Sequence, residues 1–239
     1  MNTASTQHGS CLSVATLFAV GSLLFTVLAE SSLAAEKPIT PASPPAKPAA
    51  ASPKAEAAPA WKSLFDGKTL AGWRVSDFAG RGEVEVKDGQ LILNTGSMTG
   101  VTWTNELPRM NYEISVEAMR VEGSDFFCGL TFPVGKDPCS LIVGGWGGGV
   151  VGLSSLDGQD AANNETTRYV TFKEKQWYHI RLQVTQKSIQ AWIDADKVVD
   201  VTTEEKTFSI RLEMEESKPL GIATWSTAAA LRNIRIRKL

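Results

Sequence analysis

Histidine, cysteine and excess charge of either sign are scarce in this chain. The 239 residues include 2 His and 3 Cys, and 24 basic side chains against 26 acidic ones give a net charge of −2. His8 lies in a leader-like segment, so His179 is the single histidine left for chemistry, which excludes His-rich zinc sites and metalloprotease motifs. Without a basic stripe to neutralise phosphates, the sequence argues against nucleic acid as a partner.

Charge is also missing from residues 11–28, an apolar stretch of 18 residues. The small-residue patterns Val27-Leu28-Ala29 and Ser32-Leu33-Ala34 follow it, which predicts a signal peptide over residues 1–35 and export to the periplasm or the extracellular space. The competing interpretation is an uncleaved membrane anchor, because this length just spans a bilayer. Cys11 precedes the apolar run, so it is not placed for lipid attachment.

Residues 36–60 lack the apolar side chains that a core requires. They are almost entirely Pro, Ala, Ser, Lys and Glu, with seven prolines at positions 38, 41, 44, 45, 48, 53 and 59. This composition predicts a disordered, semi-extended tether. The remaining residues, 61–239, fit one domain of ordinary size.

No segment of that domain offers a long run of helical spacing, whereas period-two alternation is frequent. Apolar residues alternate with polar ones over residues 112–118 and 208–214, which predicts half-buried strands. Shorter strands are predicted at residues 84–86, 91–93, 101–103, 127–132, 141–143, 150–153, 198–201 and 220–224. The predicted fold is all-β, an antiparallel two-sheet sandwich.

The clearest hairpin covers residues 177–194. With Gln186-Lys187 as its turn, Val184 would lie opposite Ile189, Arg181 opposite Trp192, and His179 opposite Asp194. A longer loop with a one-residue slip is the alternative, because Gln-Lys suits the left-handed positions of a tight turn poorly.

Two cysteines, Cys128 and Cys139, belong to the predicted domain. In an exported chain they could form a local disulfide. The alternative is that Cys128, inside an apolar stretch, is a buried thiol.

The segment Ser63-Leu-Phe-Asp-Gly-Lys-Thr-Leu-Ala-Gly-Trp73 resembles the opening motif of the 3-keto-disaccharide hydrolase domain family. Residues 86–91, 177–199, 219–223 and 231–236 resemble later strands of the same family, so the resemblance covers essentially residues 61–239. It implies a concanavalin A-like jelly roll of the lectin and glucanase type, export in bacteria and action on carbohydrate.

The middle of the chain departs from that family's pattern. An Asn-Ser-Gly strand ending in Arg and a Glu-x-Gln strand are usual there, whereas residues 125–133 and 140–149 differ, and no Glu lies between Glu122 and Glu165. Catalytic residues therefore do not transfer one by one. A Glu-x-Asp-x-x-Glu array is also missing, which argues against a laminarinase-type enzyme with two close carboxylates.

Glycines are dense around Trp146. Residues 147–152 satisfy the spacing G-x-G-x-x-G, but no helix follows to present its amino terminus to a pyrophosphate, so a nucleotide site is not expected. The remaining interpretations are a bulged strand and a loop on which Trp146 stacks against a sugar ring.

The segment 157–168 gathers Asp157, Asn163, Asn164, Glu165 and Arg168 in one polar loop. Such loops are usually just solvated. The functional interpretation is the rim of a carbohydrate groove, in which the two asparagines bind hydroxyls. A divalent cation with oxygen ligands would need donors from distant segments as well, because Ala161 occupies a position where an EF-hand loop requires an oxygen.

A 3-keto-glycoside has an acidic proton at C2, so a base can remove it and expel the glycosidic oxygen, with water added later. The reaction needs a base, a group that stabilises the enolate, and an acid. The candidates are Asp125, Asp157 or Glu165 as the base, Arg168 or a cation as the stabiliser, and His179 as the proton donor. The rival prediction is a non-catalytic carbohydrate-binding or adhesion module on the same fold, and a structural surface domain without ligand is a third.

Overall fold

A computed structural model describes residues 59–239. The predicted signal peptide, its anchor alternative and nearly all of the predicted linker lie outside these residues. Within them, no helix has the length and apolar content needed to span a bilayer.

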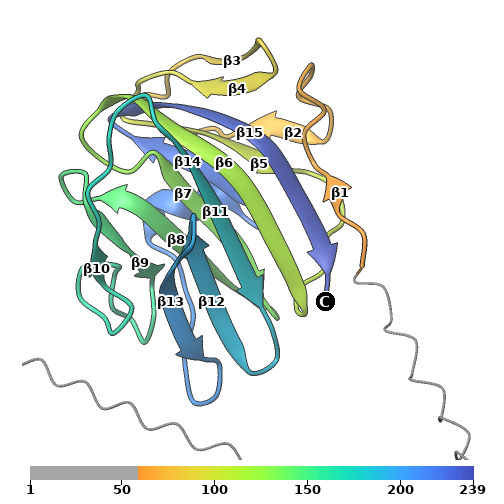
Figure 1. The fold of residues 1–239 in the computed structure, drawn as a ribbon, viewed down its shortest axis with the longest axis vertical. Coiled ribbons are helices and arrows are strands. Elements are labelled where there is room, and N and C mark those ends of the chain that lie inside the picture. The colour runs from red at the N-terminus through yellow and green to blue at the C-terminus, as the bar shows by residue number, and fades with distance from the viewer. Residues whose placement is uncertain (1–58) are drawn as a thin grey trace, which may run out of the picture. The chain divides into compact units, whose positions relative to one another are not determined.

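Two antiparallel sheets stack against each other, as Figure 1 shows. The eight-stranded sheet has the order β13-β12-β11-β6-β15-β4-β3, with β1 paired to β15, and the seven-stranded sheet has the order β10-β9-β8-β7-β14-β5-β2. The first sheet consists of β1 (Lys62–Ser63), β3 (Val84–Lys87), β4 (Gln90–Leu93), β6 (Tyr112–Gly123), β11 (Trp177–Val184), β12 (Ser188–Ile193), β13 (Asp196–Thr202) and β15 (Thr227–Lys238). The second consists of β2 (Trp73–Val75), β5 (Met98–Trp103), β7 (Cys128–Val134), β8 (Asp137–Gly145), β9 (Val150–Ser154), β10 (Arg168–Tyr169) and β14 (Gly221–Trp225). The all-β sandwich prediction is confirmed.

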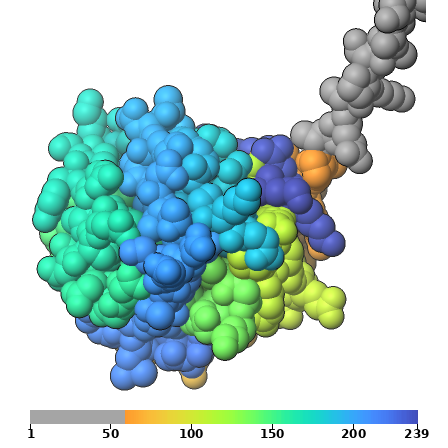
Figure 2. Space-filling view, turned by 90° about the horizontal axis from the view of Figure 1, so that it is seen from below, coloured from red at the N-terminus to blue at the C-terminus, as the bar shows by residue number. Residues whose placement is uncertain are grey.

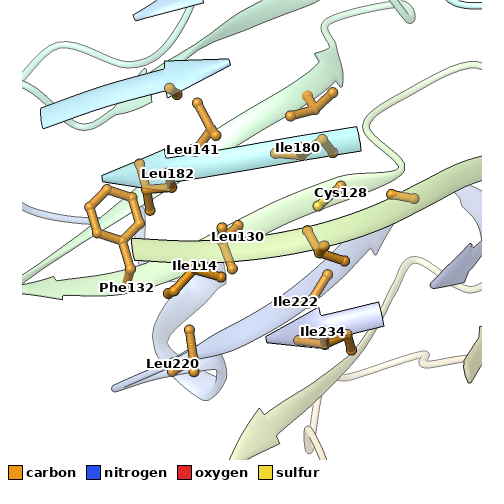
Figure 3. Packing of buried hydrophobic residues seen from close by; sticks show 14 of the residues in the cluster. Ile114, Cys128, Leu130, Phe132, Leu141, Ile180, Leu182, Leu220, Ile222 and Ile234 are labelled. Atoms are coloured by element: carbon orange, nitrogen blue, oxygen red, sulfur yellow. The ribbon is translucent and has the colours of Figure 1, made fainter. Parts of the chain in front are cut away.

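The alternating residues of both sheets build the core between the layers. Ile114 of β6 and Leu182 of β11 face Leu130 of β7 and Leu141 of β8 across the interface, and all four are buried (Figure 3). Because neighbouring side chains along a strand point to opposite faces, the intervening residues face outward on each sheet. A second apolar cluster covers part of the outer face of the seven-stranded sheet, and it includes Phe78, Met98, Phe126, Ile142, Val150, Ala161, Met214 and Ala223.

The opening motif, residues 63–73, forms a local turn that packs onto the core. Asp66 Oδ1 accepts hydrogen bonds from the backbone N–H groups of Lys68 (2.8 Å) and Thr69 (2.7 Å), which closes a turn at the left-handed Gly67 (φ +75°). Trp73 Nε1 then donates to the carbonyl of Leu64 (2.7 Å), and both side chains are buried. The motif ties the start of the domain to its core.

The β11–β12 hairpin has the predicted register. Val184 pairs with Ile189 and Arg181 with Trp192, so the slipped alternative is wrong. The ladder ends at Ile180–Ile193. Beyond it, the backbone N–H of Asp194 donates to the carbonyl of His179 (2.7 Å), and the Asp194 carboxylate accepts from the His179 backbone N–H (2.9 Å) rather than from the imidazole.

The prediction of a strand over residues 208–214 is wrong. Phe208 makes one isolated bridge, to Leu156, and the chain then forms the 3₁₀ helix η1 (Leu212–Ser217), the single helix among residues 59–239. Met214 is buried against the outer face of the seven-stranded sheet, while Leu212 is 83% exposed. The segment crosses a sheet that already has its strands. Its backbone pairing is limited to that bridge, so the rest of its alternation reflects one-sided burial.

The two cysteines of the domain are free and buried. They lie on neighbouring strands but four positions apart in register, since Cys128 pairs with Val143 and Cys139 with Phe132. The disulfide alternative is therefore wrong, and the buried-thiol alternative is confirmed. Burial raises the pKa of both thiols to about 12.

Candidate active site

A pocket of about 230 Å³ opens on the outer face of the seven-stranded sheet. Outward-facing side chains of β5, β8, β9 and β14 form part of its lining, and the segments around residues 125, 146 and 213 supply the rest. Its lining residues are Met98, Asp125, Phe126, Ile142, Trp146, Ser154, Arg211, Glu213, Met214 and Trp225. The volume lies just below the roughly 300 Å³ lower end for small-molecule sites, which suits one sugar ring better than a long oligosaccharide.

Two tryptophans border this pocket with unusual exposure. Trp146 is 43% exposed and Trp225 is 38% exposed, and they are two of the few large exposed apolar side chains of the described domain. Trp225 packs at a tilted angle against Phe126, with ring centroids 6.4 Å apart. Exposed aromatic faces beside a pocket are suited to contact with the apolar face of a sugar ring.

The backbone around Trp146 is built to project that side chain. The β8–β9 ladder shifts register between Val143 and Gly145, and the N–H groups of Gly148 and Gly149 both donate to the Gly145 carbonyl at 3.1 Å. Trp146 itself has φ +47°, a left-handed conformation that costs a bulky residue about 1 kcal/mol or more. The bulge lies at the end of β8, just before the predicted glycine run, and residues 146–149 form the turn that carries Trp146 to the pocket.

A buried arginine holds this turn from inside the sandwich. Arg120 continues the inward-facing set of β6, and one terminal nitrogen, Nη2, lies within hydrogen-bond distance of the carbonyls of Gly148 (2.9 Å), Gly144 (3.1 Å) and Asp125 (3.2 Å). Its guanidinium lies 5.1 Å from the Phe127 ring centroid. Burial lowers the pKa of Arg120, but a guanidinium stays protonated at neutral pH.

The same arginine explains why glycine is required beside it. A Cβ added at Gly144, which has φ +80°, would lie 2.5 Å from Arg120 Nη2. The pocket wall is therefore set by a contact between β6 of one sheet and a turn of the other.

Asp125 is positioned by the same turn. Its Oδ1 accepts from the Phe126 N–H (2.7 Å) and its Oδ2 from the Gly147 N–H (3.3 Å), while its own N–H donates to Thr227 Oγ1 (3.0 Å). The carboxylate is half-buried and lines the pocket next to Trp146. This arrangement fixes a carboxylate at the pocket wall while leaving lone pairs free for a ligand.

The pocket also holds an ion pair that the sequence did not suggest. Arg211 Nη2 donates to Glu213 Oε1 (2.9 Å), and Arg211 Nη1 lies 3.4 Å from Asp160 Oδ2. The hydrogen bond from Arg211 lowers the pKa of Glu213, so this group is a carboxylate at neutral pH. Arg211 is the one cationic side chain of the pocket lining.

Asp157 and Glu165 form a different cluster. Lys206 Nζ bridges Asp157 Oδ2 (3.1 Å) and Glu165 Oε1 (2.6 Å), which ties the loop before β10 to the segment after β13. In Figure 2 the teal surface around residues 150–170 lies beside the blue surface of later residues. The Thr207 N–H and then Lys206 lower the pKa of Asp157. Neither carboxylate lines the pocket.

The other polar residues of that loop serve mainly the loop itself. Asn164 Nδ2 donates to the carbonyls of Asp160, Leu153 and Gln159, and Asn163 Nδ2 donates to Asp160 Oδ1 (2.8 Å). Arg168 is exposed on the edge strand β10 and donates to the Thr167 carbonyl (2.8 Å). None of the three lines the pocket.

His179 lies on the outer face of the opposite sheet. Its Nε2 is 2.8 Å from Ser115 Oγ, and Glu117 nearby pairs with Arg232. The structure thus brings together Asp125 and Trp146 from the predicted set and places Asp157, Glu165, Arg168, His179, Asn163 and Asn164 elsewhere.

Sequence reasoning missed Ser154, Arg211, Glu213 and Trp225. Trp225 directly follows the predicted strand at residues 220–224, so continuing its alternation would have placed it on the outer face. Arg211 and Glu213 belong to the segment interpreted as a strand, and nothing local in the sequence indicates that it crosses the sheet. Among residues 59–239, no group of three or more His, Cys, Asp or Glu side chains is arranged to hold a metal ion.

Comparison with known proteins adds a family to this geometry. Residues 60–237 match the family described as 3-keto-alpha-glucoside-1,2-lyase-like domain. No curated protein matches the sequence.

Similar solved structures share the sandwich at low identity. They include a candidate glycosyl hydrolase from Parabacteroides distasonis (14% identity, 75% of this chain and 94% of that chain, TM-score 0.50) and the Crh5 transglycosylase in complex with NAG (12%, 74% and 83%, TM-score 0.54). A protein of unknown function with a galectin-like fold from Bacillus subtilis also matches (10%, 77% and 97%, TM-score 0.53). At such identities the likeness shows the jelly-roll fold alone.

Proposed function

Because the chain belongs to the 3-keto-alpha-glucoside-1,2-lyase-like domain family, a carbohydrate-active family, we propose that it cleaves 3-keto-glycosides in the pocket beside Trp146 and Trp225. The observation that carries the proposal is that the Asp125 carboxylate lines the same pocket as both tryptophans, and that this pocket has the size of one sugar ring. The tryptophans would hold the ring, and the carboxylate would face its reacting edge.

The proposed reaction is an elimination across C1 and C2. Asp125 removes the C2 proton that the C3 ketone acidifies, the electron pair forms the C1–C2 double bond, and the C1–O bond to the aglycone breaks. The released oxygen takes the proton held by Asp125. The products are an unsaturated 3-keto sugar and the free alcohol, and addition of water to the double bond would complete a hydrolysis.

Arg211 is the proposed stabiliser of the enolate that develops on the C3 oxygen. A fixed guanidinium at the edge of a partly dehydrated pocket favours negative charge that appears in the transition state. Glu213 keeps Arg211 oriented through their hydrogen bond. Since Glu213 is ionised, it cannot serve as the acid for the leaving group.

The test compares 3-keto and unoxidised glucosides that carry a chromogenic aglycone, with and without chelator. We expect aglycone release from the 3-keto substrate, and a drop of about 10²–10⁴-fold for Asp125→Asn. Asp157→Asn, outside the pocket, is the matched control and should keep full activity. Cleavage of the unoxidised substrate alone would reject the elimination, and loss of activity with chelator would reveal a cation.

The second candidate function is a non-catalytic carbohydrate-binding module. It is favoured by one observation: the predicted residues Asp157, Glu165, Arg168 and His179 do not line the pocket with Asp125. Measurable affinity for glucosides without turnover of either substrate would support this alternative.

We propose further that the chain is exported, on the strength of the uncharged apolar run at residues 11–28 and the small-residue patterns after it. Cell fractionation with amino-terminal sequencing would test this proposal. A mature protein that begins near residue 30–36 in the exported fraction supports cleavage, and full-length protein in the membrane fraction supports an anchor.

A further inference from the structure

The lining of the pocket contains a hydroxyl without a partner. Ser154 ends β9 and faces away from the core, since Val151 and Leu153 are the inward residues of that strand. The residue is 1% exposed, and among residues 59–239 its Oγ finds no hydrogen-bond partner. A buried hydroxyl left unpaired costs about 1–3 kcal/mol, so such a group requires an explanation.

No neighbouring side chain of the described domain forms a hydrogen bond with this hydroxyl. Ser140, the residue opposite Ser154 on β8, shares a hydrogen bond with Thr131 (Oγ to Oγ1, 2.8 Å). The other nearby lining residues, Ile142 and Met214, are apolar. The Ser154 hydroxyl is therefore left with the pocket itself as a source of partners.

We infer that Ser154 is a substrate-binding residue whose Oγ hydrogen-bonds an oxygen of a neutral sugar seated between Trp146 and Trp225. This inference rests on the proposed function only in taking the pocket as the sugar site. A serine hydroxyl both donates and accepts, so it suits a sugar hydroxyl or a ketone oxygen equally. The Ser154 hydroxyl thus adds a buried, uncharged hydrogen-bonding group to a pocket that also has charged lining residues.

The charges of the lining define the substrate class. Asp125 and Glu213 are acidic and Arg211 is the single base, so the acidic groups outnumber the basic one. A sugar carboxylate would meet net repulsion at short range, in a pocket that shields charges less than bulk water. We therefore expect this site to bind neutral hexosides more tightly than uronic acids.

The chain offers a matched control for this residue. Ser217 Oγ is also buried and without a partner among the described residues, but Ser217 is the last residue of η1 and does not line the pocket. Ser154→Ala and Ser217→Ala each remove an unpaired buried hydroxyl, so both should keep or slightly raise the melting temperature. Only Ser154→Ala should weaken sugar binding.

The experiment measures calorimetric Kd for methyl α-glucoside and methyl α-glucuronide, together with KM and kcat on the 3-keto-glucoside. We expect Ser154→Ala to weaken glucoside binding roughly ten-fold, with Ser217→Ala unchanged and glucuronide bound more weakly than glucoside by the wild type. Unchanged glucoside affinity in Ser154→Ala, equal binding of both sugars, or no sugar binding by the wild type would overturn the inference.

These outcomes separate the inference from the proposed reaction. A wild type that binds glucoside but does not cleave the 3-keto substrate would remove the lyase proposal while the Ser154 comparison still decides the inference. A wild type that cleaves normally, with Ser154→Ala identical to it in Kd and KM, would remove the inference and leave the reaction standing.

Discussion

Replacing the buried Arg120 by methionine should destabilise the domain and loosen the pocket together. Methionine fills a similar length but cannot donate to the carbonyls of Gly144, Gly148 and Asp125, all within 3.2 Å of Arg120 Nη2. Leaving a buried carbonyl unpaired costs about 1–3 kcal/mol, and two of these three bonds are fully buried.

Part of that cost is offset, because the substitution also removes a buried charge. Arg120 Nε has no partner among the described residues, and keeping a guanidinium away from water carries a penalty that methionine does not have. We therefore expect a net loss of about 2–4 kcal/mol in the free energy of unfolding. For a domain of this size that corresponds to roughly 5–15 °C in Tm.

Urea unfolding and calorimetric sugar binding check this prediction. The turn that carries Trp146 loses its anchor in Arg120→Met, so sugar affinity should fall even where the protein is fully folded. Arg235→Met is the control, since Arg235 stacks on Trp61 at the outer face (5.3 Å) and should cost under about 1 kcal/mol without affecting the sugar. A free energy of unfolding of Arg120→Met within about 0.5 kcal/mol of the wild-type value, together with unchanged sugar affinity, would refute the role assigned to Arg120.

Three further predictions follow from single contacts. Trp146→Gly relieves the left-handed backbone at φ +47° and should change stability by about 1 kcal/mol or less while removing most glucoside affinity in calorimetry; retained affinity would contradict its stacking role. Cys128 and Cys139, with pKa values of about 12, should resist iodoacetamide at pH 8 in the native state and react after unfolding, as peptide mass mapping would report; a cross-linked pair would contradict the buried free thiols. Arg211 holds the pKa of Glu213 below the ordinary value of 4.5, so the ion pair stabilises the fold above pH 4.5 and this stabilisation is lost as the pH falls through the folded-state pKa of Glu213. Arg211→Gln should raise the Glu213 pKa in an NMR titration. An unchanged pKa would argue against the ion pair.

Strand positions and one hairpin register were predictable because period-two alternation reports burial directly. Residues 112–118 and 177–194 alternate over enough positions that a slip by one residue would expose the whole apolar set, so the pairing of Val184 with Ile189 follows from local pattern. The same rule carried one step further would have flagged Arg120. It occupies the next inward position after Ala118, where a charge must find partners.

The same rule misled at residues 208–214, because one-sided burial resembles a strand whether or not the backbone pairs. Met214 is buried against a sheet, but the backbone there forms η1. Arg211 and Glu213 belong to this segment, so the sequence pattern did not indicate them as site residues. It indicated the polar loop at residues 157–168 as the rim of the groove instead.

The sequence by itself determined the all-β class, the family and most strand positions, because these depend on periodicity and on short motifs such as the one ending at Trp73. Only the tertiary structure decided which side chains share a pocket. Asp125, Trp146, Ser154, Arg211 and Trp225 span 100 positions of the chain, and they meet because an arginine from one sheet holds a turn of the other while a 3₁₀ segment crosses the outer face. Alternation indicates that a residue faces outward, whereas strand order and loop path decide what it faces.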